Sequence, residues 1–250
     1  MKRILIVTAL AGLCGGAIAA PAIPAHIEKA VADPARPTTD TSRDAGRKPG
    51  PVLAFAGIKP GMVVVDMLAG TGYYTRILAR AVGPQGRVYA YFGDWFDDRL
   101  RSQGKDPDMQ FTDLKRLYPN LGVIHGPLEQ FVTPEAVDMV WVSDNYHDMY
   151  IKQYSHMNYA TVNKQVFASL KHGGIYLVLD HRAVKGAGLV NEALHRMDED
   201  IAKKDIEAAG FKLVGESKIL DNPSDDDSKR VFEQGEHDHT DQFLLKFRKP

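Results

Sequence analysis

The chain has 250 residues, of which 44% are hydrophobic, and its formal net charge is −1. This length suits one sizeable domain with a buried core, and the composition argues against disorder over the bulk of the chain. Because 31 basic residues are balanced by 32 acidic ones, net charge does not indicate a nucleic-acid partner.

The first 19 residues have the pattern of a secretory signal peptide. A basic start, MKR, is followed by the uncharged apolar run ILIVTALAGLCGGAIAA, which ends in small residues. This order is typical of a segment that signal peptidase removes. We therefore predict cleavage near Ala19, or alternatively near Ala25, and a periplasmic or secreted protein.

Two other interpretations of this run are a transmembrane anchor and a lipoprotein. The run is rich in Ala and Gly and short for a span, which needs about 20 apolar residues. Lipidation of Cys14 would require a small residue before it, where the chain has Leu13. Cys14 is also the only cysteine, so the cleaved protein would have no disulfide and no thiolate nucleophile or metal ligand.

Residues 26–53 are expected to form a helical segment ahead of the main domain. The stretch RPTTDTSRDAGRK favours one short helix, and PVLAFAGI favours a second one that begins at a proline and ends at a glycine. Arg43 and Arg47 stand four residues apart and share a face of the first helix. They could be surface charges paired with Asp40 and Asp44.

Residues 54–250 alternate between short apolar strands and amphipathic helices, as expected of one α/β domain. The last two expected strands have no helix between them and are predicted to be antiparallel neighbours. The pattern predicts a mostly parallel seven-stranded sheet with helices on both faces. The expected strands are residues 62–68, 86–92, 122–126, 137–144, 175–181, 211–220 and 240–250. The expected helices are residues 73–83, about 109–118, 159–174 and 194–211.

The stretch VVVDMLAGTGYYT, residues 63–75, is typical of a ligand-binding turn between a strand and a helix. Asp66 would end the strand, and Gly70 and Gly72 would line the turn. Glycines allow the backbone to approach a ligand, and the helix start offers free N–H groups. In open parallel sheets, ligands bind beyond the carboxyl ends of the strands. The pattern indicates a nucleoside-type cofactor, although a tight connection without a ligand would look the same.

The whole layout, together with several segments, resembles the class I S-adenosylmethionine-dependent methyltransferases. More narrowly, it is similar to a group of exported bacterial proteins that are predicted methyltransferases. The segments that carry the resemblance are DMLAGTGYYTRILARAVGPQGRVYAY, VWVSDNYHDMY, LKHGGIYLVLDHRA, LHRMDEDIAKKDIEAAGF and TDQFLLKFRKP. The resemblance implies a Rossmann-like methyltransferase fold, an S-adenosylmethionine cofactor and a methyl acceptor. It also implies that an early helix, here the one with Arg43 and Arg47, can cover the cofactor pocket.

The resemblance also implies which residues meet the cofactor. The family's first motif, an acid followed by G-x-G-x-G, aligns with Asp66, Leu68, Gly70 and Gly72, so that a leucine stands at the first glycine. The family's acid for the ribose hydroxyls aligns with Phe92, with Asp94 two residues on. Near the adenine, Pro127 replaces an acid and Glu129 follows. The predicted cofactor residues are Asp66, Leu68, Gly70, Gly72, Phe92, Asp94 and Asp144.

Polar residues follow the fourth and fifth expected strands directly. The stretch SDNYHDMY follows one strand, and Asp180 and His181 end the next; we expect His195 to open the helix after it. Adjacent parallel strands end on the same rim of a sheet. His147 or His181 could remove a proton from an acceptor, with a carboxylate orienting the imidazole. The predicted catalytic residues are Asp144, Tyr146, His147, Asp148 and His181.

Methyl transfer to a small molecule is the leading prediction, with no nucleic-acid partner and no membrane span in the cleaved protein. One alternative is a periplasmic binding protein that has kept the fold and lost the chemistry. Another is a metal-dependent enzyme, because the rim offers nitrogen and oxygen ligands for a divalent ion, although their spacing matches no strict motif. Many rim residues could also be simple caps. The possible ligands are Asp144, His147, Asp148, Asp180, His181 and His195.

Overall fold

The computed structural model describes residues 22–151, 158–187, 190–191, 193–233 and 237–250. The predicted signal peptide, with Cys14 and the cleavage site near Ala19, lies outside the described residues. Ala25, the alternative cleavage site, is the first residue of helix α1 (Ala25–Val31). None of the described helices is long and apolar enough to cross a membrane.

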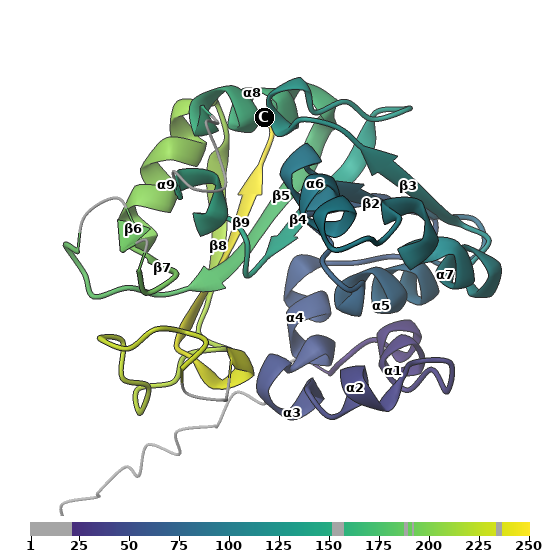
Figure 1. The fold of residues 1–250 in the computed structure, drawn as a ribbon, viewed down its shortest axis with the longest axis horizontal. Coiled ribbons are helices and arrows are strands. Elements are labelled where there is room, and N and C mark those ends of the chain that lie inside the picture. The colour runs from purple at the N-terminus through teal and green to yellow at the C-terminus, as the bar shows by residue number, and fades with distance from the viewer. Residues whose placement is uncertain (1–21, 152–157, 188–189, 192, 234–236) are drawn as a thin grey trace, which may run out of the picture.

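Seven strands form one sheet in the order β3-β2-β1-β4-β5-β9-β8 (Figure 1). The first five of these run parallel, and β9 runs antiparallel to both β5 and β8. This confirms the predicted mostly parallel sheet with an antiparallel pair at the C-terminal end. The strands are β1 (Val63–Met67), β2 (Arg87–Phe92), β3 (Leu121–His125), β4 (Val137–Ser143), β5 (Leu170–His181), β8 (Lys212–Ser217) and β9 (Gln242–Arg248).

Helices cover both faces of this sheet, as predicted. Figure 1 shows α4 and α5 on one side of the strands, with α8 and α9 on the other. Besides α1, the helices are α2 (Thr38–Thr41), α3 (Asp44–Arg47), α4 (Pro49–Ala56), α5 (Tyr73–Val82), α6 (Asp94–Ser102), α7 (Thr112–Leu117), α8 (Tyr159–Ser169) and α9 (Glu199–Ala208). Short 3₁₀ turns are η1 (Pro107–Phe111), η2 (Leu128–Gln130), η3 (His147–Tyr150) and η4 (His237–His239), and β6 (Val190–Asn191) pairs with β7 (Arg196–Met197).

The two faces of the sheet explain why its central strands are apolar without interruption. Successive side chains of a strand point to opposite faces. Val64 and Trp141 belong to the core cluster under α5, whereas Val65 and Val142 belong to the cluster under α8 and α9. All four side chains are fully buried. A strand buried on both sides cannot alternate between apolar and polar residues.

Several observed helices differ from the predicted ones. The stretch RPTTDTSRDAGRK, residues 36–48, forms two four-residue helices, α2 and α3, rather than one. The helix predicted over 159–174 ends at Ser169, and residues 170–174 instead begin β5, where the register against β4 shifts. Helix α6 (Asp94–Ser102) was not among the predicted helices.

The prediction that His195 opens the last helix was wrong. Asp198 caps α9 by accepting a hydrogen bond from the Asp200 N–H, and Glu199 and Asp200 place negative charge in the first turn. These features stabilise a helix start. His195 lies just before β7 and adopts a left-handed backbone conformation, with φ of 55°.

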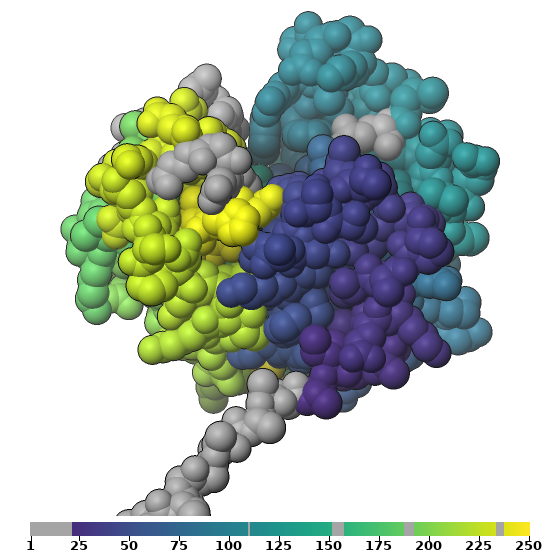
Figure 2. Space-filling view, turned by 90° about the horizontal axis from the view of Figure 1, so that it is seen from below, coloured from purple at the N-terminus to yellow at the C-terminus, as the bar shows by residue number. Residues whose placement is uncertain are grey.

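The N-terminal helices pack directly on the main sheet. Ile27 and Leu53 are fully buried in the same core cluster as α5, and the boundary predicted between residues 53 and 54 falls within α4. Figure 2 shows the N-terminal residues, in purple and blue, beside the yellow C-terminal residues on this face. Helix α3 contacts η4 there, so the N-terminal segment closes one side of the carboxyl-end rim.

Candidate functional site

A cavity of about 250 Å³ lies at the carboxyl ends of β1, β2 and β4. Arg43 and Arg47 from the α3 region contribute one wall, and Trp95, Phe96 and Arg99 of α6 contribute another. The volume lies just below the range of about 300–1,000 Å³ that is usual for small-molecule pockets. Of the residues predicted to bind a cofactor or catalyse, those that line it are Asp66, Leu68, Gly70, Phe92, Asp144, His147 and Asp148.

The turn between β1 and α5 forms the floor of this cavity. Leu68, Gly70 and Gly72 all have positive φ angles, of 59°, 57° and 84°. Glycine adopts this conformation freely, whereas other residues are strained there by roughly 1–2 kcal/mol. Gly72 precedes the first residue of α5 and does not line the cavity itself. The predicted turn is therefore present, and Leu68 follows the glycine backbone conformation despite its side chain.

Leu68 has a structural reason to remain in this strained position. Its side chain is only 6% exposed and belongs to the core cluster on the α8 and α9 side of the sheet. Burial of a leucine side chain contributes about 1.5–3 kcal/mol. This gain offsets the backbone strain, and the side chain also narrows the cavity that it lines.

Asp66 lies at the end of β1 and faces the cavity from below. It is 2% exposed, and the Thr75 hydroxyl donates a hydrogen bond to it at 2.5 Å. Burial raises the pKa of Asp66 to about 7, although Thr75 and the charge of Arg47 both act in the opposite direction. Asp66 can therefore gain or lose a proton near neutral pH.

At the end of β2 the structure offers aromatic rings in place of a carboxylate. Phe92 is buried and stacks against Phe96 with ring centroids 5.2 Å apart. Asp94 is exposed, accepts a hydrogen bond from the Trp95 N–H, and does not line the cavity. The prediction that Asp94 meets a ligand in this cavity is not supported, because α6 begins there and turns the carboxylate away. Sequence reasoning missed Trp95 and Phe96, although two adjacent aromatic residues shortly after the end of a strand are a usable signal.

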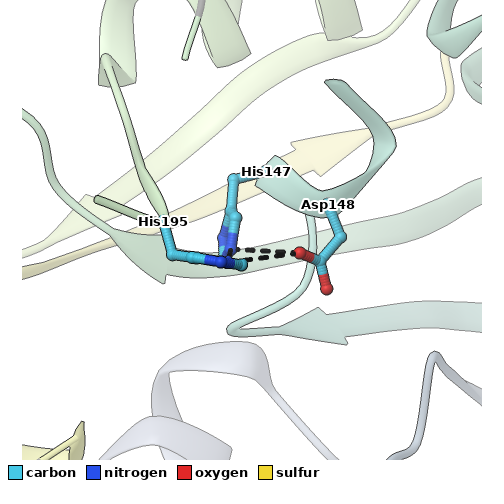
Figure 3. A group of neighbouring side chains, drawn as sticks. All are labelled: His147, Asp148 and His195. Atoms are coloured by element: carbon cyan, nitrogen blue, oxygen red, sulfur yellow. Dashed lines mark hydrogen bonds and ion pairs between the residues drawn. The ribbon is translucent and has the colours of Figure 1, made fainter. Parts of the chain in front are cut away.

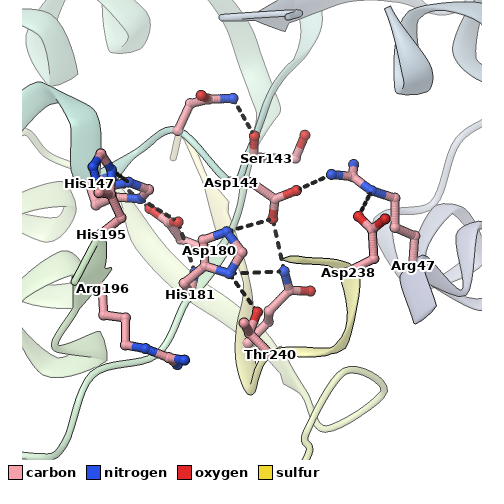
Figure 4. Close-up of polar contacts among 12 residues, drawn as sticks. Arg47, Ser143, Asp144, His147, Asp180, His181, His195, Arg196, Asp238 and Thr240 are labelled. Atoms are coloured by element: carbon pink, nitrogen blue, oxygen red, sulfur yellow. Dashed lines mark hydrogen bonds and ion pairs between the residues drawn. The ribbon is translucent and has the colours of Figure 1, made fainter. Parts of the chain in front are cut away.

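A buried ion pair joins the N-terminal helices to the end of β4. The Arg47 guanidinium donates to Asp144 Oδ2 at 2.6 Å and to Asp238 Oδ1 at 2.5 Å (Figure 4). Burial disfavours the charge of Arg47, but these two carboxylates more than offset it and raise the arginine pKa. Gln242 of β9 donates to the other oxygen of Asp144 at 3.0 Å. Arg47 was considered in the sequence as a cover for a pocket, and it does line this cavity.

His147 is held between two carboxylates at the other end of the same rim. Asp180 accepts from the His147 backbone N–H at 2.6 Å, and its second oxygen lies 2.8 Å from Nδ1. Nε2 lies 3.2 Å from Asp148 Oδ1. Burial lowers the pKa of His147, but Asp180 and Asp148 outweigh it and raise the pKa to about 10. The imidazole is therefore protonated at neutral pH in this state and acts as a hydrogen-bond donor rather than as a base.

Two predicted catalytic residues do not reach the cavity. Tyr146 is fully buried, and its hydroxyl accepts from Asn163 Nδ2 at 3.0 Å. His181 is also fully buried, and its Nδ1 lies 2.6 Å from the Thr240 hydroxyl. Tyr146 directly precedes η3 and has a helical backbone conformation, and His181 is the last residue of β5; neither side chain lines the cavity. Their predicted contact with an acceptor is therefore not supported by the geometry.

Glu129, near the expected adenine position, has a structural role. Glu129 accepts a hydrogen bond from the Asn158 N–H at 3.1 Å, where α8 begins, and does not line the cavity.

Tyr74 lines the cavity, and sequence reasoning missed it. Its hydroxyl is buried and has no hydrogen-bond partner within the residues that the structure describes. A buried polar group of this kind usually meets water or a ligand.

Comparisons with known proteins agree on the fold. No family model matches the chain. The demethylmenaquinone methyltransferase of Geobacillus stearothermophilus is 28% identical over 130 residues, which is 52% of this chain and 49% of that protein. The chain thus matches about half the length of this relative. The aligned part is similar to a methyltransferase sequence, while the activity of the whole relative does not transfer with it.

Solved structures extend the likeness over most of the chain. A SAM-dependent methyltransferase from Aquifex aeolicus has a TM-score of 0.61 over 84% of this chain and 93% of that one, at 16% identity. The cyclase SpnF has a TM-score of 0.54 over 84% of this chain and 80% of that one, at 15% identity. The fold is the Rossmann-like methyltransferase fold. The cyclase shows that this fold also supports other reactions, so the function must be argued from the site.

The strained turn gives a first prediction. In Leu68→Ala the packing is lost while the strain remains, so we expect a loss of about 2–4 kcal/mol in the free energy of unfolding. Leu68→Gly loses the same packing but relieves the strain, so it should be more stable than Leu68→Ala by about 1 kcal/mol. Urea unfolding of both variants measures the difference.

The matched control is Ala79→Gly in the middle of α5. There the ordinary preference should hold, and glycine should be less stable than alanine by about 1 kcal/mol. If Leu68→Gly is also less stable than Leu68→Ala, the left-handed conformation of this residue is not strained.

The raised pKa of Asp66 gives a second prediction. Its carboxyl titrates near pH 7 when folded and near 3.8 when unfolded, so the folded state holds an extra proton between these pH values. The free energy of unfolding therefore falls as pH rises through this window, by up to about 1.4 kcal/mol per pH unit. In Asp66→Asn this contribution is absent. The free energy of unfolding of the variant, relative to that of the wild type, should therefore rise by about 4 kcal/mol between pH 4 and pH 8.

Urea unfolding at intervals of one pH unit tests this expectation. Other titrating groups contribute equally to both proteins, so only the difference between the two curves is interpreted. Parallel curves would show that Asp66 has an ordinary pKa.

Proposed function

We propose that the protein transfers a methyl group from S-adenosylmethionine to a small-molecule acceptor. The observation that carries this proposal is the cavity at the carboxyl ends of β1 and β4, floored by the turn from Asp66 to Gly72. In sheets of this kind, ligands bind at that edge and at that turn. The methyltransferase fold and the aligned half of the relative support the choice of cofactor.

The charges around the cavity suit the parts of this cofactor. S-adenosylmethionine carries a carboxylate, an ammonium group, a positive sulfonium and an adenine ring. Arg43 and Arg47 both pair with Asp238, and their remaining N–H groups could receive the cofactor carboxylate. Asp66 could receive a cationic group in its ionised state. Trp95 and Phe96 offer aromatic faces for the adenine. We assign the cofactor to these residues together with Leu68 and Gly70.

No carboxylate in the described cavity wall replaces the ribose-binding acid at Phe92. Hydrogen bonds to a charged group contribute about 1.5–3 kcal/mol. The site would therefore rely more on stacking and on the arginines than the family pattern implies. We expect a cofactor affinity in the micromolar range rather than a tighter one.

The reaction itself requires mainly alignment. The sulfonium already activates the methyl carbon, so the protein must hold an acceptor lone pair in line with the carbon–sulfur bond. Transfer moves the methyl group to the acceptor and leaves the sulfur neutral. Asp144, His147 and Asp148 form the wall where an acceptor would lie. Both ring nitrogens of His147 already face carboxylates, those of Asp180 and Asp148, so His147 would position Asp148, and Asp148 would be the carboxylate that meets the acceptor.

Export of the protein remains part of the proposal, on the strength of the signal-peptide pattern in residues 1–19. The alternative of a periplasmic binding protein without chemistry shares this location. It differs in turnover: such a protein would hold a ligand in the same cavity and leave the methyl group in place.

Calorimetric titration of the purified protein with S-adenosylmethionine and S-adenosylhomocysteine tests the proposal. We expect one site per chain with a dissociation constant in the micromolar range. Asp66→Ala and Gly70→Leu should weaken binding at least tenfold, because the first removes a charge and the second places a side chain on the turn. Asp94→Asn is the matched control, because Asp94 does not line the cavity, and should bind as the wild type does.

Two outcomes would contradict the proposal. A folded protein that binds neither compound at millimolar concentration has no cofactor site. A protein that binds both but transfers no labelled methyl group to any compound of a metabolite extract is a binding protein.

A further inference from the structure

Three side chains beside the cavity bring their ligand atoms together. His147 Nε2 lies 3.2 Å from His195 Nδ1 and 3.2 Å from Asp148 Oδ1, and the last two atoms are 3.7 Å apart. Figure 3 shows the Asp148 carboxylate facing both imidazoles. All three residues are buried and line the cavity. Two imidazoles and a carboxylate are a common ligand set for transition-metal ions.

The three separations fit a tetrahedral ion. At bond lengths of about 2.1 Å, donor atoms around a tetrahedral ion lie about 3.4 Å apart, whereas adjacent donors around an octahedral ion lie about 3.0 Å apart. The observed separations of 3.2, 3.2 and 3.7 Å centre on the tetrahedral value. A point about 2.1 Å from all three atoms, a normal distance between zinc and nitrogen or oxygen, lies about 0.7 Å out of their plane, as expected of a tetrahedral ion with a fourth ligand on that side.

A second carboxylate supports one of these ligands from behind. Asp180 Oδ1 lies 2.8 Å from His147 Nδ1, so this nitrogen carries the proton and Nε2 points its lone pair at the triangle when the imidazole is neutral. Metal-binding histidines almost always have such a partner on their other nitrogen. The two neutral imidazoles and the two carboxylates together carry a charge that a divalent ion balances.

We propose that His147, Asp148 and His195 bind one divalent transition-metal ion of the zinc type, with a fourth position open to the cavity. The nitrogen ligands favour zinc, iron(II) or cobalt(II) over magnesium and calcium, which prefer oxygen. Three protein ligands with one free position are typical of catalytic rather than structural zinc sites. His147 and Asp148 come from η3, and His195 comes from the turn before β7.

The open position gives the metal a role in the reaction. A molecule in the cavity that carries a hydroxyl or other oxygen donor could take it and would lose its proton more easily there. This use of the site rests on the proposed methyl transfer, whereas the metal site itself does not.

Zinc binding by the untagged full-length protein tests the site without any cofactor. After removal of metal with a chelator, the protein is titrated with Zn²⁺ in competition with a chromophoric chelator. We expect one tight site per chain. His195→Ala and Asp148→Asn should bind Zn²⁺ at least about 100-fold more weakly, since each removes a ligand. The matched control is His172→Ala, an exposed histidine, which should bind as the wild type does.

The wild type alone gives a second test that does not depend on how the variants fold. Bound Co²⁺ should show the intense visible absorption of a tetrahedral site and not the weak absorption of an octahedral one. A wild type that binds Zn²⁺ no more tightly than His195→Ala, or binds Co²⁺ only octahedrally, would overturn the proposal. A protein that binds Zn²⁺ but not S-adenosylhomocysteine would keep the metal site and lose the proposed function.

Discussion

The buried ion pair between Arg47 and Asp144 is the interaction on which the rest of the site depends. Arg47 contacts Asp144, 97 residues away, and Asp238, 191 residues away. It therefore ties α3, the end of β4 and the C-terminal loop to one point. Burying one of these charges alone would cost several kcal/mol. Moving any one of the three segments away would leave such an unpaired buried charge, so the ion pairs hold all three in place. The cavity is bounded on this side because the three segments cannot separate independently.

Much of the fold could be predicted from the sequence because both faces of the sheet are covered. Strands buried on two sides must be apolar throughout, so apolar runs such as residues 62–68 and 175–181 can be recognised in the sequence as strands. The turn at Asp66, Gly70 and Gly72 could also be predicted, because positions with a left-handed backbone conformation usually require glycine. Leu68 shows the limit of this rule, because core packing of the side chain stabilises a conformation that the residue type alone disfavours.

The site was predicted only where it depends on local order along the chain. Asp144, His147 and Asp148 follow a strand directly, so their place at the rim could be inferred. A single sequence does not show which way side chains point in a turn such as the one before η3 or at the last residue of a strand, so Tyr146 and His181 were predicted to be catalytic although neither lines the cavity. Contacts between distant segments, such as His147 with His195 or Arg47 with Asp238, leave no signal in a single sequence.

The position of β9 has a consequence for the order in which the molecule assembles. This strand, Gln242–Arg248, lies between β5 and β8 and pairs with both of them, yet it is the last element of the chain. Pairings between distant segments form slowly because a long loop must close first. The same strand contributes Gln242, which bonds to Asp144. Docking of β9 therefore completes both the sheet and the hydrogen bonds of Asp144 on the acceptor side of the cavity. A chain in which β9 has not yet paired lacks both.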